Sequence, residues 1–220
     1  VNVAEGASVS GETGIALSAT VNAGQPLPSQ NRAGTVTVNN AGTITGTSGT
    51  ALDLGHTIAG VVNTGTIVGD VISGGAIVEN RGGTIDGSVV LNSFYGNPLS
   101  VFAYQGASTG VTGTITGGAG IDTLAQVFSA DGTAVIGGGL PTAFDRYGVM
   151  SDLDAEATVV VETAENPVGA TPSLFLLGGA SIVNRANLSG GVVPSSGGMP
   201  PQPMAAVTSY GFTTVDRGPF

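Results

Sequence analysis

The sequence contains no cysteine, no tryptophan and no lysine, and it has a single histidine, His56. The absence of cysteine excludes disulfide bonds, thiolate zinc sites and thiol nucleophiles. Without lysine, five arginines stand against fifteen Asp and Glu residues, and the formal net charge of the 220 residues is −10. A nucleic-acid-binding protein needs a basic surface to neutralise phosphates, so we expect no nucleic-acid partner.

A single histidine also limits nucleophilic catalysis, which needs a base close to a serine. His56 lies in LGHTIAG between Gly55 and Thr57, a context typical of a surface turn. The sequence has no G-x-S-x-G motif and no phosphate-binding loop that leads into a helix. We therefore expect no catalytic residues of the serine–histidine type and no cofactor.

The sequence is instead rich in glycine, with 38 residues, and in a repeated tetrapeptide, T-I-x-G. The five copies begin at Thr43, Thr57, Thr66, Thr84 and Thr114. Three of them belong to longer units, NNAGTITG, VNTGTIVGDV and ENRGGTIDGSV. A constant motif at unequal spacing predicts coils of variable length that return to one register.

Within each unit, short apolar runs are broken by Gly, Asn, Asp or Ser. This pattern predicts three short strands in a coil of about 20 residues. Frequent glycine and β-branched residues disfavour helices. The expected fold is all-β, a right-handed parallel β-helix (solenoid) with irregular loops and a C-terminal tail. The alternative is a β-sandwich, whose alternating strands are typically longer.

Stacked coils would place equivalent residues in ladders. The predicted aliphatic ladder consists of Ile44, Ile67, Ile85 and Ile115. The predicted polar ladder consists of Asn40, Asn63 and Asn80, whose amides can hydrogen-bond from coil to coil at one turn.

We expect three segments: a β-helix over residues 1–193, a linker rich in Pro, Gly and Ser over 194–204, and a strand-like tail over 205–220. A β-helix leaves unpaired strand edges at both ends, and edge lysines, a usual guard, are absent here. End-to-end association with other copies follows as a hypothesis, with the tail as an added strand. The alternative is a disordered tail.

The units quoted above resemble the passenger domains of bacterial autotransporters (type V secretion). TGGAGIDTL, followed by FDRYGVMSDLDAEATVVVE, is similar to the later coils of such passengers. The resemblance implies an extracellular or bacterial cell-surface location, with outer-membrane contact only through a separate barrel that this chain does not contain. The family includes adhesins, proteases, esterases and stalks, so the resemblance implies an architecture and not one activity.

We interpret the chain as a non-enzymatic structural or adhesive surface protein. The expected partners are other cell-surface copies, in a homo-oligomer or fibre, and host or surface ligands. The predicted contact surface lies between Leu91 and Gly110 and consists of Phe94, Tyr95, Phe102 and Tyr104. Alternatively, these four rings pack beneath the loop as a small satellite core.

The alternative function is a β-helical carbohydrate-active enzyme, a polysaccharide hydrolase or lyase. Asp152, Asp154 and Glu156 would share one face of a strand, and paired carboxylates catalyse glycoside hydrolysis. In a turn the same three residues would only be solvated. A lyase would need a basic residue close to acids, which leaves Arg81 with Glu79 and Asp86, or Arg146 with Asp145. Surface ion pairs explain these neighbours equally well.

One further motif, GGAGIDTLA at residues 117–125, fits the calcium-binding nonapeptide G-G-x-G-x-D-x-U-x. The neighbouring units carry no matching aspartate, and Asp122 alone cannot supply the six to eight oxygens that calcium takes. We interpret the stretch as a β-helix corner and keep Asp122 as a calcium candidate.

Overall fold

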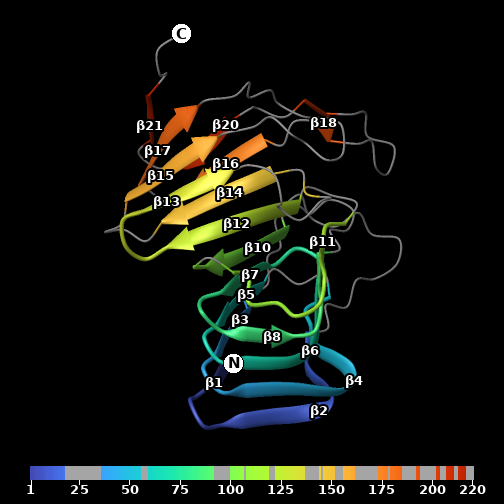
Figure 1. Cartoon of the computed structure of the whole chain (residues 1–220). Helices are drawn as coiled ribbons and strands as arrows, with labels where there is room; N and C mark the ends of the chain where they lie inside the picture. Colours follow the sequence, from blue (N-terminus) through green and yellow to red (C-terminus); the bar gives the residue numbers. More distant parts are fainter. Residues whose placement is uncertain are drawn as a thin grey trace. The chain divides into compact units, whose positions relative to one another are not determined.

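The computed structural model describes residues 1–17, 36–55, 59–91, 100–106, 108–118, 122–136, 144, 146–151, 156–161, 173–177, 179–184, 192–193, 202–203, 207–210 and 213–216. All regular elements in these ranges are β-strands, which confirms the expected all-β class (Figure 1). No helix among them has the length and apolar character of a membrane span. The chain divides into two units, Val1–Asp122 and Thr123–Phe220.

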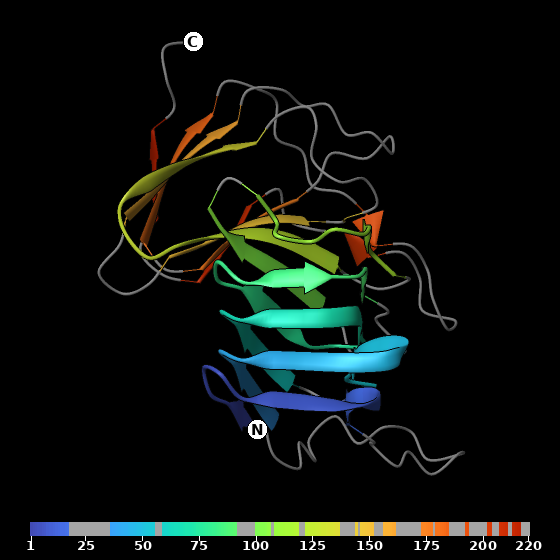
Figure 2. The ribbon, with the colours of Figure 1, turned by 60° about the horizontal axis from the view of Figure 1, so that its bottom comes forward.

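The first unit contains two parallel sheets, and the chain passes back and forth between them (Figure 2). In the first sheet the order is β1 (Asn2–Val3), β3 (Val36–Asn40), β5 (Ala59–Asn63), β7 (Ile77–Asn80) and β10 (Ser100–Gln105). In the second sheet it is β2 (Ser8–Ala16), β4 (Thr43–Asp53), β6 (Thr66–Ser73), β9 (Val89–Leu91) and β11 (Ile115–Thr116), and β8 (Thr84–Asp86) also pairs with β6. All these pairings are parallel.

The aliphatic ladder is confirmed for three of its four members. Ile44 pairs with Ile67 and Ile67 with Ile85, and all three side chains are fully buried. The prediction is wrong for Ile115, which pairs with Val89. Val111 instead forms the bridge to Ile85. The isoleucine of this T-I-x-G copy lies four residues beyond the ladder position, so it belongs to the next column.

The asparagine ladder is also confirmed. The Asn40 amide donates to Asn63 Oδ1 at 2.8 Å, and the Asn63 amide donates to Asn80 Oδ1 at 2.8 Å. The Asn80 amide ends the ladder on the carbonyl oxygens of Gly83 and Thr109. All three side chains are buried, so these hydrogen bonds satisfy amides that would otherwise be costly to bury.

Each repeat of the second sheet has two paired segments. Before Gly69, β6 pairs with β8, and after it β6 pairs with β9. Gly69 has φ +116, a conformation that favours glycine, and it separates the two segments. Together with one strand of the first sheet, this agrees with the predicted three short strands per repeat.

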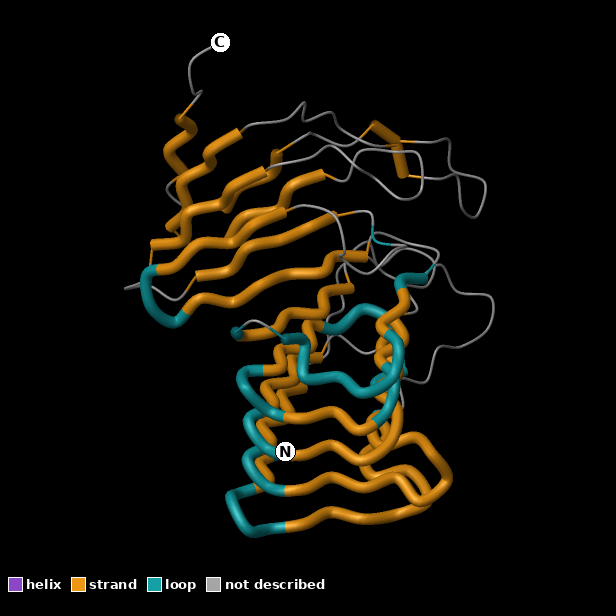
Figure 3. Tube along the Cα trace, viewed as in Figure 1, coloured by secondary structure: helices purple, strands orange, loops and turns teal. Residues whose placement is uncertain are grey.

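The corners between the two sheets lie above one another, at the loops of Figure 3 that join β3 to β4, β5 to β6 and β7 to β8. Each contains a glycine: Gly42, Gly65 or Gly83. A Cβ on Gly65 would overlap the carbonyl oxygen of Gly42, and one on Gly83 would lie 2.7 Å from that of Gly65. These glycines therefore allow the backbone of one corner to lie directly against the backbone of the next.

The second unit contains two series of four strands, and neighbouring strands within each series pair in parallel. One contains β12 (Asp122–Phe128), β14 (Arg146–Ser151), β16 (Ser173–Leu177) and β20 (Val207–Tyr210). The other contains β13 (Gly132–Ile136), β15 (Glu156–Val161), β17 (Gly179–Asn184) and β21 (Thr213–Asp216). A separate antiparallel pair joins β18 (Val192–Val193) to β19 (Gln202–Pro203).

The strand-like part of the predicted tail is present as β20 and β21, which pair in parallel with β16 and β17. Most residues of the predicted linker, 194–204, lie outside the described ranges. The predicted segment boundaries therefore stay predictions.

Candidate functional site

The outward side of the second sheet carries aligned hydroxyl groups in its first segments. Because Ile44, Ile67 and Ile85 face the core, their strand neighbours face outward. We call the aligned outward residues Thr43, Thr45, Thr66 and Thr84 the hydroxyl face. Thr43 pairs with Thr66 and Thr66 with Thr84, so three hydroxyls form one column. Neighbouring strands lie about 4.8 Å apart, which sets the spacing of this column.

The hydroxyl face is held by the strands beneath it. The fully buried isoleucine ladder fixes the register, since a slip by one residue would turn every isoleucine to solvent. At its edge, Asp86 ends β8 and accepts a hydrogen bond from the Thr112 hydroxyl at 3.0 Å. The result is an uncharged strip with one carboxylate at its margin, suited to ligands that present hydroxyl groups.

A corner insertion, residues 46–49, interrupts the regular pairing beside this face. Between Thr45 and Thr50 β4 advances five positions, whereas its partner β6 advances two, from Val68 to Asp70. In repeat proteins such insertions map to loops on one face, which is often the binding face. The insertion is exposed at Thr47, Ser48 and Gly49.

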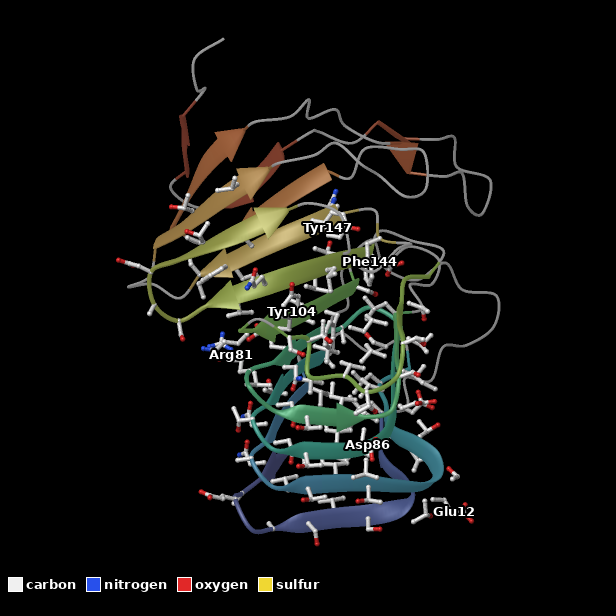
Figure 4. The ribbon with its side chains drawn as sticks, in the orientation of Figure 1. Glu12, Arg81, Asp86, Tyr104, Phe144 and Tyr147 are labelled. Carbon is white, nitrogen blue, oxygen red and sulfur yellow. The ribbon has the colours of Figure 1, made fainter. Side chains whose placement is uncertain are left out.

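Two hydroxyls of the insertion donate hydrogen bonds to β2, the neighbouring strand of the second sheet. Thr47 Oγ1 donates to the carbonyl oxygen of Gly11 at 3.1 Å, and Ser48 Oγ donates to that of Glu12 at 2.5 Å. We call this pair the hydroxyl clamp. Glu12 itself is exposed, and its side chain extends from the second sheet into solvent (Figure 4).

The predicted aromatic contact surface needs correction at Phe102. This ring is fully buried in β10, in register with Val78, so it is part of the core and not of the surface. Tyr104, in register with Asn80, is half-buried, and its burial raises the pKa of the phenol. Phe94 and Tyr95 lie outside the described residues. The sequence interpretation treated residues 91–110 as loop, whereas Ser100–Gln105 is a strand.

Of the predicted catalytic groups, Arg81 forms an ion pair with Glu79, with 2.7 Å between Nε and Oε2. Asp86 lies apart from Arg81 in Figure 4. Arg146 begins β14, and Glu156 begins β15, but the side chain of Glu156 is not described. His56, Asp145, Asp152 and Asp154 lie outside the described ranges.

Asp122, the calcium candidate, is fully buried at the start of β12. Its carboxylate accepts a hydrogen bond from the backbone N–H of Gly118, as expected for a corner residue. In the described part of the chain, no three His, Asp or Glu side chains gather in a group that could hold a metal ion. The calcium assignment stays a prediction.

The sequence interpretation overlooked the corner insertion. Its signal was the three additional residues TSG in TITGTSGTALD, compared with TIVGDV in the next unit. No protein-family model, curated protein or solved structure matches the chain.

Proposed function

We propose that the paired parallel sheets are successive coils of a right-handed parallel β-helix that serves as a structural or adhesive scaffold. The observation that carries the proposal is the register, in which buried isoleucine and asparagine ladders repeat from strand to strand. Such ladders stabilise a rigid stack and perform no chemistry of their own. The scaffold belongs at the bacterial cell surface or outside the cell, in keeping with the resemblance to autotransporter passengers.

The hydroxyl face is the adhesive surface in this proposal. Aligned Thr43, Thr66 and Thr84 can exchange hydrogen bonds with a neutral glycan on a host or on another cell. The net charge of −10 disfavours anionic partners, because like charges repel. Each threonine contact is weak, so adhesion depends on many copies acting together.

The adhesive role can be tested with purified protein coupled to beads. Beads carrying the wild-type chain should adhere to surfaces coated with neutral glycans. Replacing Thr43, Thr66 and Thr84 together by valine keeps the shape, removes the hydroxyls and should lower adhesion at least fivefold. The matched control is Thr37→Val, an exposed threonine of the first sheet. Equal adhesion of all three proteins would contradict the role of the face.

The same protein should release no reducing ends and no unsaturated products from neutral or acidic polysaccharides. Release that is lost on replacing Asp152 or Glu156 by the corresponding amide would overturn the scaffold proposal in favour of a carbohydrate-active enzyme.

A further inference from the structure

The strand β2 is paired on one side only among the described strands. β2 ends the second sheet and pairs with β4. In the same way, β1 ends the first sheet and pairs with β3. Asn2, Ser8 and Ser10 are exposed on these two strands. An unpaired strand edge is a template for a strand from another chain.

The free backbone groups of this edge can be assigned. The N–H of Thr43 donates to the carbonyl oxygen of Ala7 at 2.9 Å. Successive residues of a parallel strand address opposite neighbours, so Ala7 and Val9 face β4. The N–H and C=O groups of Ser8 and Ser10 therefore face away from the sheet. The N–H of Ala41 likewise donates to the carbonyl oxygen of Val3. Val3 therefore faces β3, and the backbone groups of Asn2 face outward.

The core beneath this edge is also less covered than the core above it. Val9 pairs with Ile44 and Ile15 pairs with Leu52. Ile44 and Leu52 are fully buried, whereas Val9 and Ile15 are only partly buried. A further strand with an apolar residue over Val9 would complete the apolar column. The strands of this chain carry such residues at that position, namely Ile44, Ile67 and Ile85.

A bulge limits the length of the open edge. The register between β2 and β4 shifts between Gly11 and Thr13. Bulges that bend an edge strand are one device that prevents strand addition. The hydroxyl clamp lies on the other, paired side of β2, because Thr47 and Ser48 belong to β4. Only the part of β2 before the bulge, which includes Ser8–Ser10, keeps a straight path.

We propose that the edge of β2 at Ser8–Ser10 pairs with a strand of a second copy of this chain, and that the bulge between Gly11 and Thr13 limits this pairing to that short segment. The inference rests on the proposed scaffold function and gives it a partner, another copy, together with the surface that this partner uses. A short pairing segment makes the association weak and reversible, which suits copies that join at a surface.

The test is the weight-average molar mass of the full chain, measured by light scattering over a range of concentrations. Ser10→Pro removes the outward N–H of Ser10 without removing a hydrogen bond to β4. It should weaken self-association at least tenfold. Thr37→Val should leave association unchanged.

A wild-type chain that stays monomeric at every concentration would overturn the proposal, as would association that Ser10→Pro leaves intact. Circular dichroism and thermal melting verify that each variant folds, and Ser8→Pro replaces Ser10→Pro if the latter does not. A folded wild-type chain that adheres to glycans but never associates refutes this inference and leaves the adhesive scaffold standing. Association without adhesion refutes the adhesive role and leaves the pairing of copies standing.

Discussion

At the scale of single residues, buried amides contribute more to stability than exposed ones of the same type. Asn63 both accepts from Asn40 and donates to Asn80, and its side chain is fully buried. Asn63→Ala would leave buried polar atoms without partners, so we expect the free energy of unfolding to fall by about 3 kcal/mol. The neighbouring control is Asn39→Ala, whose exposed amide bonds to Asn2. Its expected loss is below about 1 kcal/mol, and equal losses in urea unfolding would contradict the ladder's role.

The asparagine ladder has a direction, and its acceptor end is open. Each amide donates to the next repeat, so Asn40 Oδ1 receives nothing; it is buried and has no partner. The register position beside Asn40 is Val3, which is also buried. Val3→Asn would supply the missing donor, whereas Val3→Asp, of nearly the same shape, supplies none. We expect the Asn variant to be more stable than the Asp variant by about 2 kcal/mol at pH 7. Equal melting temperatures would refute the directional ladder.

The phenol of Tyr104 makes the stability of the first unit sensitive to alkali. Burial raises its pKa above the ordinary value of 10.0. The unfolded chain therefore loses this proton at a lower pH than the folded chain does. The contribution to stability is complete below pH 10 and is lost as pH rises from there through the raised pKa. Tyr104→Phe should make the decline of stability above pH 10 less steep, and it should leave the pH dependence of stability between pH 7 and 9 unchanged. Urea unfolding at each pH measures both.

At the scale of elements, the stacked corners are the most restrictive feature. Gly65→Ala would drive its Cβ into the backbone carbonyl of Gly42, which cannot move without shifting the corner. We expect a loss of about 1–3 kcal/mol, the usual cost of overpacking. Gly60→Ala, in the neighbouring strand β5, meets no atom within 4 Å and has no left-handed φ. It should leave stability unchanged or raise it by up to about 1 kcal/mol, because alanine restricts the unfolded chain. Chemical unfolding of the two variants compares them directly.

The repeated motifs predicted those elements in which local pattern and pairing agree. T-I-x-G and the asparagines before it predicted the positions of Ile44, Ile67 and Ile85 and of the amide ladder, because these residues recur at the same place in each repeat. They failed at Ile115, where an identical tetrapeptide pairs one column further along. Register is a property of two strands, and the sequence of one strand does not contain it.

The candidate site was harder to predict for the same reason. Aromatic residues between turn signals indicated an exposed loop, yet Phe102 is in register with Val78 and lies in the core. The corner insertion becomes visible only when β4 is aligned with β6, since Gly, Ser and Thr are common throughout the chain. The hydroxyl face, in contrast, follows directly from the alternation of threonine with the predicted isoleucine ladder.

At the scale of the whole molecule, net charge opposes the association of copies. Fifteen acidic residues against five arginines give −10 at pH 7, and the isoelectric point lies near 4.1. As pH falls from 7 toward that value, carboxylates take up protons and the repulsion between copies decreases. We therefore expect the molar mass from light scattering to rise as the pH is lowered, and also when salt screens the charges at pH 7.

The Ser10→Pro variant separates the two sources of this association. Loss of repulsion acts on any contact between copies, whereas strand pairing needs the free N–H groups at Ser8 and Ser10. If the edge of β2 carries the association, the variant should keep a lower molar mass than the wild type at every pH above 4.1. Identical curves for the two proteins would mean that lowered charge alone drives copies together through contacts other than the strand edge. In this proposal charge and strand edge act on the same equilibrium in opposite directions: charge repulsion keeps copies apart, and the edge of β2 specifies how they join.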